Sequence, residues 1–229
     1  ENSKQKFSNL HSDLPGLIAK YCSETEVKKF IHVSAIGANA DSKSLYQQSK
    51  FSGEQKALAN FKNTVIIRPS VVCGNEDNFT NLFAKLSLFP VIPVVKPDYK
   101  FQPILVDDVA TAIVRAIEIK KNEGKIYEIG GPIIISFKDM VKSIVSTIGK
   151  KNFIIGMPMP LAKIQAALFS LMPKPLLTKD QCEILNEADN IVSNKNLTLK
   201  DLNVKPTDVQ KAMTKWLWRF RSGGEFAKI

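Results

Sequence analysis

Tyr46 and Lys50 stand four residues apart in the stretch SLYQQSKFSGE, and Ser34 lies twelve residues before Tyr46 in HVSAIG. On a helix, residues four apart project from the same face. An ammonium group beside a phenol favours the phenolate and lowers the pKa of the phenol toward the range of a general acid or base. A serine hydroxyl at the end of a strand can hydrogen-bond a substrate oxygen or the tyrosine itself. The three side chains together indicate a proton relay.

The same pattern has an ordinary interpretation. A tyrosine and a lysine four apart arise by chance in many proteins, where the lysine is solvated and the tyrosine is half-buried. A short motif gains meaning from its structural context. Here Ser34 would end a strand, and the next helix would carry Tyr46 and Lys50 at the carboxyl edge of a sheet, where ligands bind in parallel sheets. The residues alone leave both interpretations open.

The elements that must position these side chains alternate along the chain. Apolar runs predict strands, and helical spacing predicts helices with Leu14, Leu17, Ile18 and Tyr21 on one face of the first. The predicted strands lie at 29–35, 63–72, 101–106 and 124–132, and the helices at 8–22, 44–61, 78–89 and 107–121. This alternation predicts an α/β fold, with a parallel sheet and helices on both of its faces.

The pattern changes near residue 150, so we divide the chain into 1–150 and a smaller, mainly helical lobe at 151–229. The lobe holds a helix opened by Thr178 and a last helix opened by Pro206 and Thr207 and ended by Gly223 and Gly224. Two further segments, PLAKIQAALFSLMP and KWLWRFR, carry apolar and aromatic side chains that suit a membrane interface or a partner surface. The apolar faces that we single out are Leu161, Ile164, Leu168, Phe169 and Met172, and Trp216, Trp218 and Phe220. The alternative is that both segments pack into a core.

The composition limits the partners and the chemistry. The formal net charge is +10, but the excess is mostly dispersed lysine without a zinc finger, an RNP motif or an arginine cluster, which predicts a solvated basic surface and no nucleic-acid partner. Three scattered cysteines and two histidines indicate neither a disulfide framework nor a metal site. His32 lies in an apolar run, where a hydrogen-bonded strand histidine is expected.

Four blocks carry a resemblance to a known family: HVSAIGANADSKSLYQQSKFSGE, IIRPSVVCGNEDNF, FQPILVDDVATAI and YEIGGP, in this order. They resemble the short-chain dehydrogenase/reductase superfamily in its atypical, extended branch, which is epimerase/dehydratase-like. Within that branch, KFIHVSAIGAN, GNEDNF and PVIPVV are similar to the accessory subunits of respiratory complex I called alpha subcomplex subunit 9. The resemblance implies that 1–150 is the C-terminal part of an NAD(P)-binding Rossmann domain.

The resemblance also implies roles for individual residues. Ser34, Tyr46 and Lys50 match the catalytic triad of the family and its cofactor contacts, and Lys50 would hydrogen-bond the nicotinamide ribose. The Gly-rich turn that cradles the pyrophosphate, GxxGxxG, has no match in the sequence. We therefore expect the N-terminal Gly-rich βαβ units of the family to be absent from this chain, together with the residue that selects NAD or NADP.

Further positions follow from the same blocks. Arg68, Pro69 and Ser70 match the strand-end turn whose backbone lies against the nicotinamide carboxamide. Gln102 and Asp107 match the block that lines the substrate cleft. For Asp107 a helix cap is the alternative, and we favour the cap because aspartate is so common before an amphipathic helix.

Two functions remain open at this stage. The first is an NAD(P)-binding accessory subunit of complex I, peripheral to the inner membrane on the mitochondrial matrix or bacterial cytoplasmic side, with a structural cofactor for which NADPH is favoured over NAD. The lobe would then contact the membrane surface. The second is an active oxidoreductase or epimerase acting on a sugar-nucleotide, sterol or isoprenoid-like substrate. A regulatory NADP-binding redox sensor is a third hypothesis.

Overall fold

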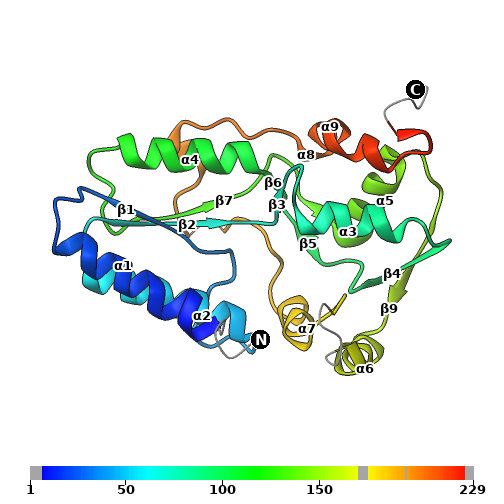
Figure 1. Cartoon of the computed structure of the whole chain (residues 1–229), viewed down its shortest axis with the longest axis horizontal. Helices are drawn as coiled ribbons and strands as arrows, with labels where there is room; N and C mark the ends of the chain where they lie inside the picture. The colour runs from blue at the N-terminus through cyan, green and yellow to red at the C-terminus, as the bar shows by residue number, and fades with distance from the viewer. Residues whose placement is uncertain (1–6, 170–174, 194, 225–229) are drawn as a thin grey trace.

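The computed structural model describes residues 7–169, 175–193 and 195–224, and these form an α/β molecule with two packed regions (Figure 1). The first region is built on a parallel sheet with the strand order β1-β2-β7. Its strands are β1 (Phe30–Val33), β2 (Thr64–Pro69) and β7 (Ile126–Ile129). The apolar side chains of β2 are buried, as expected of a central strand that is covered on both faces.

Helices cover both faces of this sheet, which confirms the fold predicted from the alternating pattern (Figure 1). On one side lie α1 (Leu14–Ser23), which continues a π-helical turn at Ser8–Asp13, and α2 (Leu45–Asn60). On the other side lies α4 (Val106–Glu118). The Ser44 side chain accepts a hydrogen bond from the Gln47 amide, so α2 begins where its N-cap residue predicts.

The buried face of α1 is not the predicted one. Leu14, Leu17, Ile18 and Tyr21 are 40–60% exposed, whereas Pro15, Gly16 and Ala19 are buried. Small residues let the two helices approach closely: a Cβ at Gly16 would meet the Lys56 side chain, and one at Gly53 on α2 would collide with the carbonyl of His11. Close packing against α2 therefore selects the small-residue face of α1 instead of its more apolar face.

The second region contains short two-stranded sheets and several helices. Its paired strands are β3 (Val72–Cys73) with β6 (Ile104–Leu105), β4 (Val91–Val95) with β9 (Phe153–Met157), and β5 (Lys100–Phe101) with β8 (Ile135–Ser136). Its helices are α3 (Asn78–Leu86), α5 (Phe137–Thr147), α6 (Met159–Phe169), α7 (Lys179–Asn186), α8 (Val209–Ala212) and α9 (Thr214–Leu217). Short 3₁₀ turns occur at Leu199–Leu202 and Trp218–Phe220.

The molecule has two hydrophobic cores. One joins the central sheet to α4 and includes Val65, Ile67, Ala112 and the later residues Leu199 and Leu202. The other joins α3, β4, α5, α6, α7, α8 and α9. Each core therefore draws residues from both sides of residue 150, where the sequence analysis places its domain boundary, and that boundary stays a prediction.

Two predicted helix starts are wrong. The N-cap of α4 is Leu105, without a side-chain cap, and Asp107 and Asp108 lie in the first turn of the helix. The cap role that we favoured for Asp107 is therefore not observed, because the helix begins at Val106, two residues earlier than a cap at Asp107 would require. The last helix is capped by Asp208 and gives way after Ala212 to α9 and a 3₁₀ turn.

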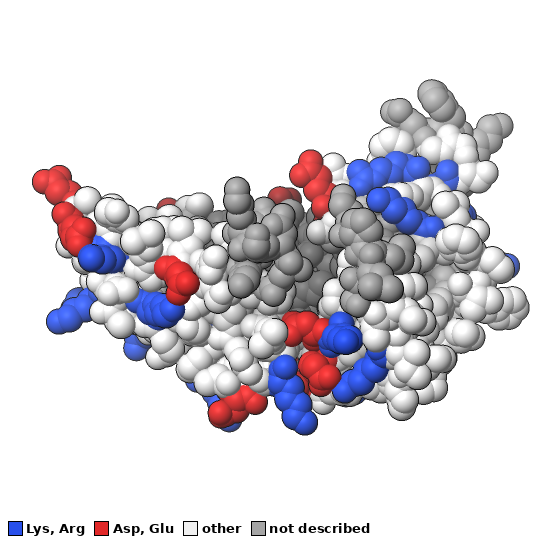
Figure 2. Space-filling model, turned by 60° about the horizontal axis from the view of Figure 1, so that its bottom comes forward, with Lys and Arg blue, Asp and Glu red and all other residues white. Residues whose placement is uncertain are grey.

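The two apolar segments of the lobe differ in exposure. In KWLWRFR, Trp216 is buried and its Nε1 donates to Thr80 Oγ1 over 3.1 Å, so this segment contributes to a core. On α6, Leu161, Ile164 and Leu168 are 54–65% exposed, which leaves an apolar face at the surface. Met172 lies outside the described residues. Figure 2 shows wide uncharged areas between small groups of acidic and basic side chains on the face that it displays.

The sequence analysis expected neither a disulfide framework nor a metal site. Cys22, Cys73 and Cys182 are all free. The part of the chain that the structure describes contains no cluster of three or more acidic, cysteine or histidine side chains able to hold a metal ion. Among the described helices, none has the length and apolar character needed to span a bilayer.

Candidate functional site

Ser34, Tyr46 and Lys50 lie at the carboxyl end of the central sheet. Ser34 follows the last residue of β1, and its amide donates to Ile67 O of β2 over 2.7 Å. Lys50 Nζ donates to Val33 O over 3.2 Å and lies 5.9 Å from the centre of the Tyr46 ring. The lysine thus connects the strand end to the tyrosine, and the first turns of α2 hold both side chains on one face.

The Tyr46 phenol is not activated as the sequence analysis expected. Burial raises its pKa above the ordinary value of 10.0, because the charged phenolate is disfavoured where water is excluded. The rings of Phe7 and His11 enclose the tyrosine, with centroids at 5.9 Å and 5.3 Å in edge-on arrangements. The effect of burial on the Tyr46 pKa is therefore larger than the opposite effect expected from the Lys50 ammonium group.

Two groups at this site have unused hydrogen-bonding capacity. Ser34 is 3% exposed, and its Oγ has no hydrogen-bond partner among the described residues. Burial lowers the pKa of Lys50, an effect that the Glu54 carboxylate opposes. A buried hydroxyl without a partner costs about 1–3 kcal/mol, so Ser34 calls for a ligand or water atom. A donor-acceptor pair of this kind fits the hydroxyls of a nicotinamide ribose.

His32 departs from its prediction as a hydrogen-bonded strand histidine. It is 8% exposed, and its Nε2 has no partner in the described part of the structure. Burial, followed by the charges of Lys50 and His11, lowers the pKa of His32 to about 4. The imidazole is therefore neutral at neutral pH.

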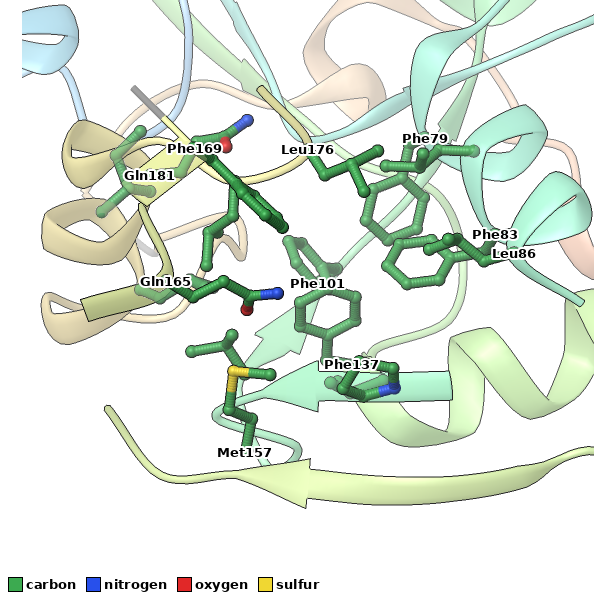
Figure 3. A pocket seen from close by; sticks show the side chains of 17 residues that line it. Phe79, Phe83, Leu86, Phe101, Phe137, Met157, Gln165, Phe169, Leu176 and Gln181 are labelled. Atoms are coloured by element: carbon green, nitrogen blue, oxygen red, sulfur yellow. The ribbon is translucent and has the colours of Figure 1, made fainter. Parts of the chain in front are cut away.

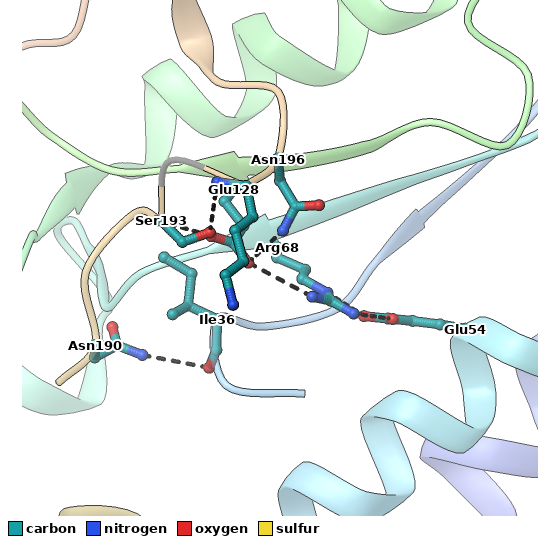
Figure 4. Close-up of polar contacts among 8 residues, drawn as sticks. Ile36, Glu54, Arg68, Glu128, Asn190, Ser193 and Asn196 are labelled. Atoms are coloured by element: carbon teal, nitrogen blue, oxygen red, sulfur yellow. Dashed lines mark hydrogen bonds and ion pairs between the residues drawn. The ribbon is translucent and has the colours of Figure 1, made fainter. Parts of the chain in front are cut away.

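Arg68 holds α2 to the sheet through buried ion pairs (Figure 4). Its Nε and Nη2 donate to the two carboxylate oxygens of Glu54 over 2.8 Å and 2.6 Å. Its Nη1 lies 3.5 Å from Glu128, whose carboxylate also accepts from the Ser193 amide and from Asn196 Nδ2. Because Glu54 lies one turn beyond Lys50, this bidentate pair fixes the helix that carries Tyr46 and Lys50.

Ser70 and Asn190 tie the loops that follow the strands. Ser70 Oγ lies 2.7 Å from Asn190 Oδ1 and accepts from the Gln102 amide over 3.2 Å. Asn190 Oδ1 accepts from the Val71 amide, and Asn190 Nδ2 lies 3.4 Å from Ile36 O (Figure 4). Sequence reasoning missed Asn190, since nothing in its neighbourhood distinguishes it from a loop asparagine.

The residues predicted for the cofactor turn and the substrate cleft lie near these hydrogen bonds. Pro69 ends β2, and its carbonyl accepts from the Ile36 amide. Gln102 uses its amide within the chain: Nε2 donates to Gly131 O over 2.8 Å, and Oε1 accepts from the Val192 amide over 3.0 Å. Asp107 is exposed, whereas the neighbouring Asp108 is buried and accepts from the amide and hydroxyl of Thr207. The roles assigned to Gln102 and Asp107 in a substrate cleft stay predictions.

Asp180 of α7 is a further residue that sequence reasoning missed at this site. Its carboxylate accepts from Ser44 Oγ over 2.8 Å, from the Leu45 amide over 2.7 Å and from the Tyr46 amide over 3.4 Å. Asp180 lies in the first turn of α7. Its contact with the start of α2 spans more than a hundred residues of chain and leaves no local signal.

The model of the RmlD substrate binding domain family matches residues 1–221. The chain belongs to this family. Its fold and the order of its strands and helices are those of the Rossmann-type short-chain dehydrogenases, as the resemblance in the sequence implied.

This member of the RmlD substrate binding domain family is similar to a mitochondrial protein of Dictyostelium discoideum, NADH dehydrogenase [ubiquinone] 1 alpha subcomplex subunit 9. The two are 32% identical over 207 residues, which are 89% of this chain and 58% of that protein. The chain thus spans somewhat more than half the length of that curated relative.

Two solved structures share the fold. The dTDP-4-dehydrorhamnose reductase of Bacillus anthracis, in complex with NADP, has a TM-score of 0.63 at 15% identity and covers 90% of this chain and 70% of its own. The UDP-glucuronic acid 4-epimerase of Bacillus cereus, in complex with UDP-glucuronic acid and NAD, has a TM-score of 0.60 at 19% identity, with 95% and 70% covered.

Proposed function

We propose that this chain belongs to an NAD(P)-binding accessory subunit of respiratory complex I, in which the nucleotide is held in place and not turned over. The similarity to alpha subcomplex subunit 9 supports the association with complex I. The enclosed Tyr46 is the observation that carries the structural role, because the rings of Phe7 and His11 cover it and burial raises its pKa, which disfavours the phenolate that a proton relay forms. A poor proton donor suits a cofactor clamp better than a turning-over relay.

The nucleotide is assigned to the residues at the carboxyl end of the sheet. Lys50 and Ser34 bind the nicotinamide ribose, Tyr46 packs beside it, and the backbone of Pro69 and Ser70 lines the carboxamide. Arg68 contributes indirectly, since its guanidinium is engaged by Glu54 and Glu128. When bound, the nucleotide supplies a hydride donor or acceptor at the nicotinamide ring.

We favour NADP(H) over NAD as the occupant. Structural neighbours in complex with each nucleotide support a nicotinamide dinucleotide in general. The additional phosphate of NADP(H) is favoured by the net charge of +10, because a positive field raises the local concentration of an anionic ligand.

The membrane side of the proposal rests on the lobe. The exposed Leu161, Ile164 and Leu168 of α6 offer an apolar face to a neighbouring subunit or to the lipid surface. The protein would lie peripheral to the inner membrane, on the mitochondrial matrix side or the bacterial cytoplasmic side. Peripheral attachment of this kind needs no membrane-spanning helix in this chain.

A second candidate function is an active NAD(P)-dependent oxidoreductase or epimerase. The position of Ser34, Tyr46 and Lys50 at the carboxyl end of the sheet favours it, because this is the edge at which parallel sheets bind ligands. In this case Tyr46 would exchange a proton with the substrate.

Purification of the whole protein from its own membranes in mild detergent separates the two. We expect it to co-migrate with NADH:quinone oxidoreductase activity and to release about one nicotinamide nucleotide per chain on denaturation. Lys50→Met should reduce the retained nucleotide at least tenfold. Lys56→Met on the same helix removes an exposed lysine that pairs with Asp13 and should leave retention unchanged.

A different result of this purification would contradict the proposal. A soluble protein that exchanges its nucleotide within seconds and migrates apart from complex I would refute the structural role and favour the second candidate.

A further inference from the structure

A cavity of about 290 Å³ lies in the second core, between α3, β4, α5, β9, α6 and α7 (Figure 3). Five aromatic rings face it, contributed by Phe79, Phe83, Phe101, Phe137 and Phe169. Four of these rings pack on one another with centroids 5.2–5.6 Å apart, which gives the cavity a continuous aromatic wall. Its size is at the lower end of the range for small-molecule sites, about 300–1,000 Å³.

The described residues that line this cavity include no charged side chain, and its polar side chains are Gln165 and Gln181. Gln181 Oε1 is occupied, since it accepts from the Thr178 amide in the capping box of α7. The amide of Gln165 points from α6 into the cavity (Figure 3). Gln165 therefore presents a neutral hydrogen-bonding amide to a largely apolar space.

We propose that this cavity binds an aliphatic chain of about ten carbons that carries a neutral oxygen, as an alcohol, ketone or ester, hydrogen-bonded to Gln165. Water occupies about 30 Å³ per molecule in the liquid. A methylene group is of similar size, so 290 Å³ holds about ten such groups. A diphosphate group is disfavoured here because its charges would lose water without a cation among the described lining residues to replace it.

One helix, α7, lines the cavity and also contacts the start of α2, which carries Tyr46 and Lys50. Gln181, Ile184 and Leu185 of α7 line the cavity. Asp180 on the same helix accepts from Ser44 and Leu45 at the start of α2. An occupant of the cavity thus contacts α7, the helix that holds the first turn of α2, which carries Tyr46. Binding in the cavity does not require a bound nucleotide.

The test is calorimetric titration of the full chain with 1-decanol, decanoate and UDP-glucose as separate probes. We expect saturable, one-to-one binding of 1-decanol, at least tenfold weaker binding of decanoate because its charge is unpaired, and no binding of UDP-glucose in the cavity. Leu176, which is 49% exposed at the cavity, offers a way to fill it from outside. Leu176→Trp should weaken 1-decanol binding at least tenfold.

A matched control is Leu161→Trp, which adds the same ring to an exposed position of α6 outside the cavity and should leave binding unchanged. Gln165→Leu is a second variant at a half-buried position, and the lost hydrogen bond should weaken 1-decanol binding about two- to tenfold. Circular dichroism establishes that each variant is folded.

Absence of saturable 1-decanol binding to the folded protein would overturn the proposal. So would equal weakening by Leu161→Trp and Leu176→Trp, or binding of UDP-glucose that displaces 1-decanol. The outcome is independent of the nucleotide: decanol binding without retained nicotinamide nucleotide would support the cavity and refute the proposed cofactor role, and the reverse result would do the opposite.

Discussion

The carboxyl end of the central sheet and the cavity of the second core are incomplete in different ways. At the sheet, charges are paired across elements, as Arg68 is with Glu54 and Glu128, while the Ser34 hydroxyl has no described partner. In the cavity the described lining is aromatic and uncharged, and what is unfilled is volume. The first region is suited to a polar ligand and the second to an apolar one, and α7 contacts both.

The largest effect should come from removing the charge that holds the polar region together. Arg68→Ala leaves Glu54, which is fully buried, without a counter-charge. Breaking a buried ion pair in this way costs about 3–5 kcal/mol in the free energy of unfolding. Chemical denaturation of the variant and the wild type measures this difference.

The same type of pair in the second region provides the control. Lys163 and Glu183 lie 2.8 Å apart on α6 and α7 but are partly solvated. Lys163→Ala should change the free energy of unfolding by at most about 1 kcal/mol. Equal losses for the two variants would show that burial does not distinguish the polar region from the lobe.

A pH titration probes His32 in the polar region. The pKa of His32 is about 4 in the folded protein and 6.5 in the unfolded chain. Between these values the unfolded chain binds a proton that the folded protein does not, so the free energy of unfolding should fall as the pH is lowered through this window. The shift corresponds to a loss of about 3 kcal/mol by pH 4.

His32→Phe should remove this component and flatten the dependence between pH 6.5 and pH 4, as measured by denaturation at a series of pH values. A variant that keeps the full pH dependence would assign the effect to other groups.

The smallest effect should come from the contact that joins the two regions. Asp180→Ala removes the acceptor for Ser44 and Leu45 at the start of α2 and should cost about 1 kcal/mol. It should also speed the release of bound nucleotide, because the first turn of α2 carries Tyr46. Asp139→Ala in the first turn of α5 is the control for loss of a similar carboxylate. If both variants release nucleotide at the wild-type rate, α7 does not support the site.

Local signals in the sequence were sufficient for the alternation of strands and helices and for two helix starts. The helix predicted at 44–61 begins after Ser44, and Thr178 caps the helix that it was predicted to open, because a cap depends on a hydroxyl and an amide only a few residues apart. The spacing of Tyr46 and Lys50 likewise predicted that they share a helix face, and the strand at Phe30–Val33 follows from an apolar run.

Only the tertiary structure decided which residues pair with one another and in which direction the Tyr46 pKa shifts. Glu54, Glu128, Asn190 and Asp180 meet their partners across long stretches of chain, and the raised pKa of Tyr46 depends on rings that pack from another helix. The exposed face of α1 shows the same limit, since close approach to α2 outweighed the apolar pattern. Capping and periodicity act over a few residues, whereas burial and ion pairing depend on which distant segments are brought together.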